Sequence, residues 1–367
     1  MSVLNKFLAF LTRAIIAGLA IAFVVVYLWP TVMERRNDTP ENSLAAPFVP
    51  TSYADAVNRA APAVVSIYNH YVIMEMAPNS QSGSPVALYR LKRQLNEGSG
   101  VILGENGYIL TNHHVVDQAI KINIALWDDR IAEARVVGSD PATDLAVLKV
   151  DLADLPVAPV NENLAVRVGD VVLAIGNSLG FSHTVTMGIV SATGRNDLHS
   201  LLYQDFIQVD AAINAGNSGG ALVNTAGELV GINTRRADTL KGAQNIGFAI
   251  PIGLATDVMN QIIEYGKVRR GWLGADFGDL RPTIQEDGSA IRVGIGVREV
   301  QRDGPAWKAG IRTGDVIMDL DGEQVSDASR FLLSISQRVP GSQIELVVQR
   351  GTEAFETYAT LIQQPPL

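Results

Sequence analysis

The chain reads Asn214-Ala215-Gly216-Asn217-Ser218-Gly219-Gly220-Ala221-Leu222 shortly after an apolar run, and no other stretch of its 367 residues says more about its fold. A Gly-x-Ser-Gly-Gly sequence gives a nucleophilic serine the surroundings that it needs. Gly216 can adopt a backbone conformation closed to residues with a Cβ, so the N–H groups of Gly216 and Ser218 can point at one oxyanion. Gly219 and Gly220 leave room for a substrate. Hydrolysis of peptide bonds with Ser218 as nucleophile is therefore the leading hypothesis.

A loop without chemistry is the alternative for this motif. Clusters of Gly, Asn and Ser mark ordinary loops in many proteins. The chain contains a similar cluster at Gly176-Asn177-Ser178-Leu179-Gly180, where nothing else suggests a nucleophile. A base and an acid elsewhere in the sequence are needed to favour a nucleophilic serine over an ordinary loop.

The composition excludes several classes of function. The formal net charge is -9, and the basic residues form only isolated pairs, so nucleic acid is not expected as a partner. The chain has no cysteine, which excludes disulfides, thiolate catalysis and cysteine-ligated zinc. No cofactor and no metal is expected. The length suits about two folded domains.

The N-terminus predicts a membrane anchor. No charged residue occurs from Ala14 to Met33, close to the roughly 20 residues of a membrane-spanning helix. A cleaved signal peptide is the competing interpretation, but its apolar region would be only about 7 to 15 residues long. We therefore expect a single-pass anchor in residues 1–36, followed by a linker in 37–51. Orientation stays open, because basic residues flank both ends of the run.

Short runs rich in β-branched residues, separated by Gly, Asn and Asp, predict antiparallel barrels or sandwiches and a mainly β fold. We expect a first folded domain in residues 52–257, a connecting helix in 258–269 and a second domain in 270–363. Val72 to Asn96 is predicted to be a polar loop. The runs are 63–68, 100–103, 108–111, 121–126, 146–150, 171–175 and 228–232.

A serine hydroxyl needs a base to take its proton, and that base needs an acid to orient it. His114 ends a strand-like run, where its side chain could emerge at a cleft, while His113 would point the other way in an extended segment. Surface or packing roles are expected for His70, His183 and His199. Asp144 stands directly before a buried strand and is the candidate acid. The order His114, Asp144, Ser218 is that of the chymotrypsin-like enzymes.

At this point the chain resembles the HtrA family of serine proteases, from about Tyr53 to the C-terminus. The similarity rests on TNHHVV, DPATDLAVLKV, VGDVVLAIGN, TVTMGIVSATGR and AAINAGNSGGALVNTAGELVGINT. It implies a trypsin-like double β-barrel with His114 as general base, Asp144 as its orienting acid and Ser218 as nucleophile. The oxyanion hole would be formed at Gly216, Asn217 and Ser218. Departures from the family pattern fall at Ser178, in Gly176-Asn177-Ser178, and at His183, near the barrel interface.

Two local features refine that expectation. Digestive serine proteases carry an aspartate before the nucleophile that pairs with a newly cut amino terminus, whereas this chain has the neutral Asn217. Zymogen activation is therefore not expected, and loops must order the oxyanion hole. The specificity pocket is expected at Ala212, Ile213 and Asn214, which predicts cleavage after small or medium apolar residues.

The C-terminal part resembles a single PDZ domain, on the strength of GPAWKAGIRTGDVIMDLDGEQV and of the segment from Gly271 to Ala275. Such a domain binds a free C-terminus as an added strand. The resemblance places the carboxylate-binding loop at Trp272, Leu273, Gly274 and Ala275. Asp327 to Arg338 is expected to form the helix on the other side of the groove, with Phe331 or Leu332 in or near its apolar pocket. An inert appended domain is the alternative.

One PDZ domain and an N-terminal anchor resemble the DegS-like branch of the family. That branch implies a homotrimer on the bacterial inner membrane, with its folded domains in the periplasm. Its partners would be C-terminal peptides of misfolded outer-membrane proteins and a membrane anti-sigma factor as substrate. Arg195 and the residues after it would connect the PDZ domain to the oxyanion hole, and Tyr53 is a candidate trimer contact. A general periplasmic quality-control protease is the alternative, and a PDZ-based binding protein is a further one.

Overall fold

The computed structural model describes residues 2–24, 27, 52–76, 89–161, 164–176, 184–196, 203, 205–214, 216–234, 246–281, 283–284, 290–291 and 293–365. Several expectations fall outside these residues. They are the linker 37–51, His183, His199, the departure at Ser178 and most of the segment after Arg195.

Residues 1–52 and 53–367 form separate units. In the first unit, helix α1 spans Ser2–Phe23. Among the described residues, no helix combines the length and the apolar character that crossing a membrane requires. The anchor expected from the sequence is therefore not supported by the structure, and the part of its run from Leu28 to Met33 lies outside the described residues.

The second unit begins with α3 (Ala54–Ala60) and the short 3₁₀ helix η2 (Ala61–Ala63), which lead into a closed antiparallel barrel. Its strands follow the order β1-β2-β3-β6-β5-β4, and the short helix α4 (His113–Val116) follows β3. The bounds are β1 Val64–Met76, β2 Tyr89–Ile102, β3 Tyr108–Asn112, β4 Lys121–Ala125, β5 Ile131–Asp140 and β6 Leu145–Lys149.

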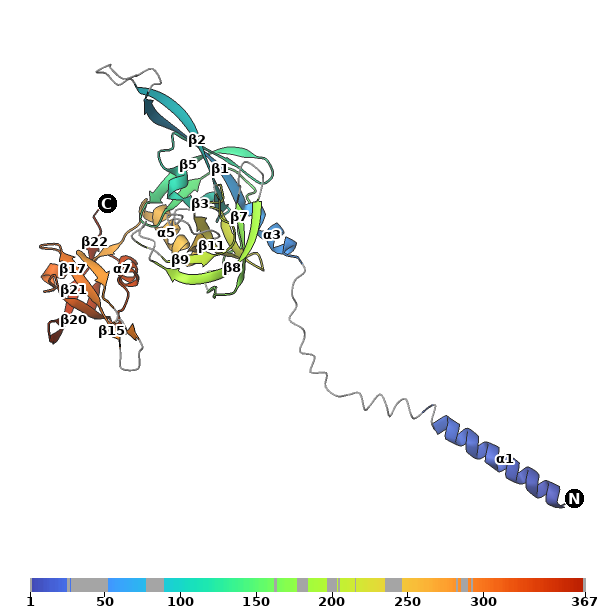
Figure 1. The fold of residues 1–367 in the computed structure, drawn as a ribbon. Helices are drawn as coiled ribbons and strands as arrows, with labels where there is room; N and C mark the ends of the chain where they lie inside the picture. Colours follow the sequence, from blue (N-terminus) through green and yellow to red (C-terminus); the bar gives the residue numbers. More distant parts are fainter. Residues whose placement is uncertain are drawn as a thin grey trace. The chain divides into compact units, whose positions relative to one another are not determined.

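The loop predicted for Val72 to Asn96 is wrong at 72–76 and 89–96, and residues 77–88 lie outside the described residues. β1 and β2 continue into this region as a paired hairpin, with Val72 opposite Arg93 and Met74 opposite Leu91. Figure 1 shows the two strands extending beyond the barrel. The hairpin cannot be recognised in the sequence because its outer part has no buried face. Met74 and Leu91, for example, are 68% and 73% exposed. Without a buried face the hydrophobic alternation that marks a strand is lost.

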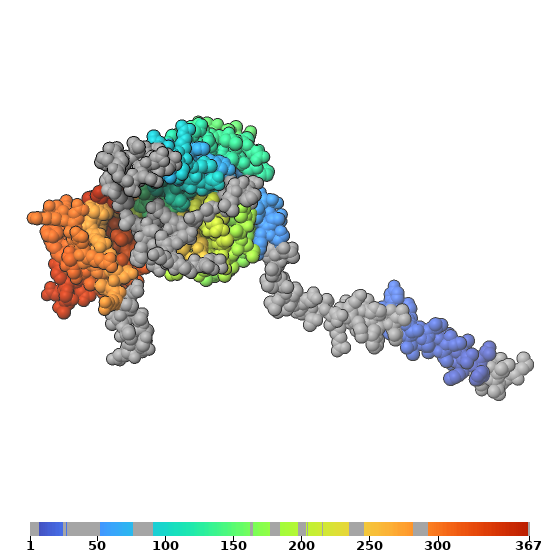
Figure 2. Space-filling view, turned by 45° about the horizontal axis from the view of Figure 1, so that its top comes forward, coloured from blue at the N-terminus to red at the C-terminus, as the bar shows by residue number. Residues whose placement is uncertain are grey.

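A second closed antiparallel barrel follows, with the strand order β10-β11-β12-β9-β8-β7. Its strands are β7 Val171–Gly176, β8 Thr184–Arg195, β9 Phe206–Val209, β10 Ala221–Asn224, β11 Leu229–Thr234 and β12 Gly247–Pro251. The yellow-green surface in Figure 2 belongs to this barrel and includes β8. The predicted antiparallel barrels are thus confirmed.

Helix α5 (Ile252–Tyr265) closes the first domain by covering both barrels. It contacts β5, β6, β11 and β12, and its buried residues recur at helical spacing, from Ile252 through Ala255 and Val258 to Ile262. That spacing places them on one face. Gly266 ends the helix with φ +72, a left-handed conformation that glycine adopts without strain. The buried core of this helix and the first barrel continues into the outer face of the second barrel.

The C-terminal domain has its own apolar core and a five-strand path β14-β17-β18-β20-β21 with β14 at one edge. The principal strands are β14 Ala275–Asp279, β17 Ile295–Val300, β18 Val316–Leu320, β20 Gln343–Arg350 and β21 Glu353–Thr360, and the helices are α6 Pro305–Lys308 and α7 Ala328–Ser336. The two-residue strands are β13 Gly271–Trp272, β15 Thr283–Ile284, β16 Ala290–Ile291, β19 Glu323–Gln324 and β22 Ile362–Gln363.

Candidate active site

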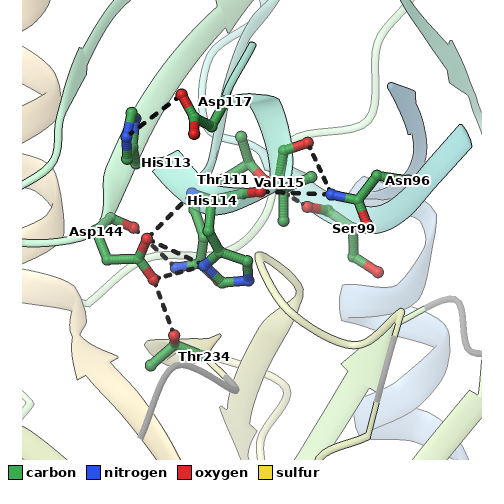
Figure 3. A network of polar contacts seen from close by, with 10 residues as sticks. Asn96, Ser99, Thr111, His113, His114, Val115, Asp117, Asp144 and Thr234 are labelled. Carbon is green, nitrogen blue, oxygen red and sulfur yellow. Dashed lines mark hydrogen bonds and ion pairs between the residues drawn. The ribbon is translucent and has the colours of Figure 1, made fainter. Parts of the chain in front are cut away.

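His114 and Asp144 form a close pair between two short turns of the first barrel. Nδ1 of His114 lies 2.8 Å from Oδ2 and 3.0 Å from Oδ1 of Asp144. The backbone N–H of His114 donates to Oδ1 of the same carboxylate at 3.1 Å, as Figure 3 shows. The pair holds Nδ1, so Nε2 is the ring nitrogen left for another partner. This is the arrangement that orients a histidine base.

The histidine lies in a helical turn rather than in the extended segment expected from the sequence. β3 ends at Asn112, and α4 carries both His113 and His114. The two rings still differ in surroundings. The ring of His113 approaches Asp117, just after the end of α4, at 4.0 Å, whereas the ring of His114 faces Asp144. It is therefore a helical turn, and not an extended strand, that separates the two rings and leaves His114 beside Asp144.

Asp144 is completely buried and has φ +58. Aspartate is one of the few residues that tolerate this left-handed region. Its carboxylate also accepts the hydroxyl of Thr234, on β11 of the second barrel, at 3.1 Å. Its carbonyl oxygen accepts the side-chain amide of Asn112 at 3.0 Å. Burial of an ionised carboxylate requires such donors, so Asp144 is fixed from both barrels.

The turn that carries Ser218 is held by both barrels as well. Gly216 has φ +94, and its carbonyl oxygen accepts the hydroxyl of Ser99 at 2.6 Å. The carbonyl oxygen of Ser218 accepts the backbone N–H of Ser99 at 2.8 Å. The N–H of Gly219 donates to the carbonyl of Asn233 on β11, also at 2.8 Å. These bonds fix the backbone on either side of the serine.

The absence of a side chain at Gly219 lets the serine turn approach the histidine turn. Gly219 has φ +81, and a Cβ there would collide with the carbonyl oxygen of Ser99 and the hydroxyl of Thr111. Thr111 and Asn112 immediately precede the helical turn of His114. The structure therefore brings the turn of Ser218 against the end of β3, which leads into the helical turn of His114.

The residues expected to shape the specificity pocket lie on the loop before this turn. Ile213 is 9% exposed and belongs to the core of the second barrel. Ala212 is exposed, and its carbonyl accepts the hydroxyl of Thr186 at 2.9 Å. The N–H of Asn217 donates to the carbonyl of Asn214 at 3.1 Å. The carboxylate of the nearby Asp210 accepts the N–H of Ile189 at 2.6 Å, so Asp210 is hydrogen-bonded to β8 of the second barrel.

Sequence reasoning missed four residues of this site. Ser99, Thr111, Asn112 and Thr234 are all at most 1% exposed and act only through hydrogen bonds to other members of the site. Nothing in their local sequence distinguishes them from ordinary strand residues. Hydrogen bonds to residues distant in the sequence give them a role, and those of Ser99 and Thr234 cross from one barrel to the other. His70, for which a surface or packing role was expected, is exposed on β1.

The segment around Arg195 reaches the C-terminal domain. Nε of Arg195 donates to the side-chain oxygen of Gln208 at 2.9 Å, which ties the end of β8 to β9. The side-chain amide of the next residue, Asn196, donates to both carboxylate oxygens of Asp327 at 2.9 and 2.8 Å. Asp327 caps α7 by accepting the N–H of Arg330. The polar end of β8 is therefore bonded to the start of α7.

A groove of about 670 Å³ lies between the edge strand β14 and helix α7. Leu332 lines it, whereas Phe331 is buried in the domain core and packs edge-on against Phe277. Of the segment expected to bind a carboxylate, Leu273 is buried in the same core. The other groove residues of interest are Tyr203, Trp272, Gly274, Ala275 and Gln364.

Tyr203 links this groove to a buried ion pair. Its hydroxyl bonds to Gln364 at 2.8 Å, and its ring lies 4.7 Å from the guanidinium of Arg270. Burial raises the pKa of Tyr203 above its usual range, and the charge of Arg270 opposes that rise. Arg270 in turn donates to both carboxylate oxygens of Asp140, at 2.7 and 2.5 Å. Asp140 precedes Asp144 by only four residues.

Comparison with known proteins agrees with this architecture. Residues 98–232 match the trypsin-like peptidase domain family, and residues 271–360 match the PDZ domain family. The chain is 40% identical over 360 residues to the serine endoprotease DegS of Escherichia coli K12, which covers 97% of this chain and 98% of that one.

Two further similarities come from a periplasmic enzyme and from a solved structure. The chain is 41% identical over 278 residues to a probable periplasmic serine endoprotease, DegP-like, of Chlamydia trachomatis, over 75% of this chain and 55% of that protein. It also resembles the structure of the HtrA-type protease AlgW with a decapeptide, with a TM-score of 0.72 and 46% identity over 86% of this chain and 100% of that one.

Proposed function

Because the chain belongs to the HtrA family of serine endopeptidases, with a trypsin-like double barrel followed by one PDZ domain, we propose that His114, Asp144 and Ser218 are its catalytic triad. The observation that carries this assignment is the pair of His114 with the fully buried Asp144, held against the turn of Ser218.

In the proposed reaction, Oγ of Ser218 attacks the carbonyl carbon of the scissile bond while Nε2 of His114 takes its proton. Asp144 stabilises the imidazolium through Nδ1–H, and His114 then gives the proton to the leaving amine. The N–H groups of Gly216 and Ser218 stabilise the tetrahedral oxyanion. Asn217 lies between them, and because its own N–H donates to the carbonyl of Asn214, it holds the oxyanion-hole turn rather than adding a third donor. Water, activated by the same histidine, hydrolyses the acyl-enzyme. The triad needs no metal or cofactor for these steps.

The test is the activity of Ser218→Ala against an unfolded protein substrate. We expect a loss of about 10⁴-fold or more in kcat. His114→Ala should lose a similar factor, and the double variant should be no worse than either single one, because the two residues act as a unit. Full activity in Ser218→Ala would overturn the assignment. Additive losses would show that the two residues act independently.

The specificity pocket is proposed to accept small or medium apolar side chains. The support is that Ala212 adds only a methyl group, Ile213 contributes to an apolar core, and Asp210 is bonded to Ile189 rather than left to attract a basic residue. Cleavage of a peptide library, with product sequencing, measures the preference directly. Fastest cleavage after Arg or Lys would contradict it.

The PDZ domain is proposed to bind peptides with a free C-terminus. β14 is an edge strand, so a peptide can add to it, and Leu332 on α7 supplies an apolar contact opposite. The structure of AlgW is described as holding a decapeptide. Leu332→Ala should weaken binding of a hydrophobic C-terminal peptide, whereas Val339→Ala, 63% exposed and outside the groove, should not.

The physiological role is proposed to be regulated proteolysis in the bacterial envelope stress response. Exposed C-termini of misfolded outer-membrane proteins would bind the PDZ domain, and a membrane anti-sigma factor would be cut. The support is the similarity to DegS over almost the whole of both chains. The bond between Asn196 and Asp327 offers a connection between the domains through the segment that begins at Arg195.

Addition of a peptide with a hydrophobic C-terminus separates the candidate roles. Increased cleavage of an anti-sigma factor supports the regulated protease. Rapid degradation of unfolded protein without peptide supports a general quality-control protease, which the similarity to a DegP-like enzyme favours. Binding without turnover would support a PDZ-based binding protein.

The protein is proposed to act as a homotrimer in the periplasm, with Tyr53 as a trimer contact and residues 1–36 attached to the inner membrane. The location is supported by the periplasmic relative, and the attachment rests only on the uncharged run from Ala14 to Met33. Cell fractionation of the full chain and of a variant lacking residues 1–36 tests the attachment. Sedimentation of wild type and Tyr53→Ala tests the trimer.

A further inference from the structure

The helical turn that carries His114 has little stability of its own. α4 contains only four residues, His113–Val116. A helix of this length lacks the intrahelical bonds that stabilise longer ones, and the carbonyl groups at its end need outside partners. Whatever satisfies these carbonyls also fixes the position of the histidine.

Two asparagines of the β1–β2 hairpin supply those partners. The side-chain amide of Asn69 donates to the carbonyl oxygens of Val115 at 3.0 Å and of Asp117 at 3.2 Å. The amide of Asn96 donates to the carbonyl oxygens of His114 at 3.4 Å and of Val115 at 3.5 Å, as Figure 3 shows. Of the four carbonyls from His114 to Asp117, all except that of Val116 thus accept from these two amide groups.

The two asparagines are directly opposite each other in the hairpin register. Directly opposite residues of an antiparallel pair project from the same face. Their pair lies at the base of the hairpin, only two pairs from Ile67 and Gly98, both of which are buried. The barrel wall therefore holds both donors on one side of α4.

The orientation of Asn69 shows that donation decides its position. Asn69 is 1% exposed, and its side-chain oxygen is buried without a hydrogen-bond partner among the described residues. The opposite orientation of the amide would place that oxygen against two carbonyl oxygens. The Asn69 amide therefore has two N–H bonds to the His114 turn, while its oxygen has no bond. These N–H bonds are what holds Asn69 to the turn.

We propose that Asn69 and Asn96 are positioning residues that hold the turn of His114 in its productive place. The inference rests on the proposed function, since it presumes that His114 is the base. Neither asparagine needs to touch the substrate. Their removal should slow proton transfer from Ser218 without changing how the substrate binds.

The experiment compares Asn96→Asp, which keeps the shape but loses the donor, with Asn96→Gln, which keeps a donor. Asn69→Leu removes the second amide without adding a charge to a buried position. Gln94→Glu is the matched control, because Gln94 lies on the same hairpin and accepts from Tyr71 at 2.6 Å, away from α4. The readouts are kcat and KM for a peptide substrate, and the rate at which a fluorophosphonate labels Ser218.

We expect Asn96→Asp and Asn69→Leu to lower kcat and the labelling rate by about 10-fold or more, since small misplacements of a catalytic group cost up to about 100-fold. KM and PDZ peptide binding should not change, and Asn96→Gln should recover most of the rate. Gln94→Glu should match wild type. If Asn69→Leu does not fold, the half-buried Asn96 still decides the question.

Full activity of Asn96→Asp, in a protein that Ser218→Ala inactivates, would overturn the positioning role and leave the proposed function intact. A raised KM with unchanged kcat would also overturn it, because it would indicate substrate contact. Activity retained in Ser218→Ala would instead refute the proposed function itself.

Discussion

At the scale of single residues, the site depends on groups that hydrogen-bond to the candidate triad rather than on the triad alone. Asp144 is fully buried, has a left-handed backbone conformation and accepts hydrogen bonds from both barrels. A charge so placed keeps the histidine oriented only while its donors are present. Two predictions test the surroundings of the triad, one at a donor to Asp144 and one at a glycine of the serine turn.

The first concerns the hydroxyl of Thr234. Thr234→Val replaces the donor to Asp144 with a methyl group of similar size, so packing is largely kept. Because a hydrogen bond to a charged group contributes about 1.5–3 kcal/mol, kcat should fall by about 10- to 100-fold. Steady-state kinetics measure it. Thr256→Val, which removes only two hydrogen bonds within α5, is the control, and equal losses in both variants would contradict the prediction.

The second prediction compares two glycines with positive φ. Gly169 has φ +95 and open space around it, so Gly169→Ala should cost only the left-handed strain, about 1–2 kcal/mol of stability. Gly219→Ala adds a collision with Ser99 and Thr111. Displacement of the oxyanion donors should then lower kcat by about 100-fold or more. An active Gly219→Ala enzyme would show that the serine turn does not need this close approach.

At the scale of elements, ion pairs at strand ends fix the turns of the PDZ domain. Asp315, just before β18, accepts hydrogen bonds from the side chain of Arg350 at the end of β20 and from the N–H of Arg312. Burial raises the pKa of Asp315, but the bonds from Arg350 and Arg312 outweigh burial, and the net pKa is lowered. Arg350 correspondingly has a raised pKa.

This shift predicts how stability depends on pH. Since the pKa of Asp315 is lower in the folded domain than the roughly 3.9 of the unfolded chain, its contribution is complete above about pH 4. It disappears as pH falls through the folded pKa. The melting temperature of wild type should therefore exceed that of Asp315→Asn at pH 6, and the difference should shrink below pH 4. A constant difference down to about pH 2.5 would contradict the assignment.

At the scale of the whole molecule, contacts link the protease domain to the PDZ domain at several points. Arg270, directly before β13, bonds to Asp140 of the first barrel, and both side chains are at most 9% exposed. Breaking a buried pair leaves an uncompensated charge, which costs about 3–5 kcal/mol. Removing either Arg270 or Asp140 alone should therefore destabilise the connection between the two domains.

The prediction is that Arg270→Leu lowers the free energy of unfolding by about 3–5 kcal/mol in urea. Adding Asp140→Asn should restore part of it, because the unpaired charge is removed. Arg269→Leu is the matched control, since the neighbouring arginine packs over the exposed Tyr265 and should change stability by about 0.5 kcal/mol at most. If Arg270→Leu were as stable as Arg269→Leu, the ion pair of Arg270 with Asp140 would be dispensable for stability.

The sequence by itself determined the chemistry. The residues at 114, 144 and 218, their order, the apolar β-branched runs and the glycines of the serine turn all carry local signals, because a nucleophile, its base and its backbone conformation each require particular residue types. The helix expected over Asp327 to Arg338 came instead from the resemblance to a PDZ domain, and in the structure it spans Ala328–Ser336 with Asp327 as its cap.

Only the tertiary structure decided what surrounds that chemistry. Thr234 lies 90 residues from Asp144, and Asn69 lies 46 from Val115, so no local pattern joins them. The sequence predicts a loop for the outer parts of β1 and β2 because a strand without a buried face shows no hydrophobic alternation. Hydrogen bonds between distant strands are set by barrel closure and register, and a register is a property of the packed molecule rather than of any one segment.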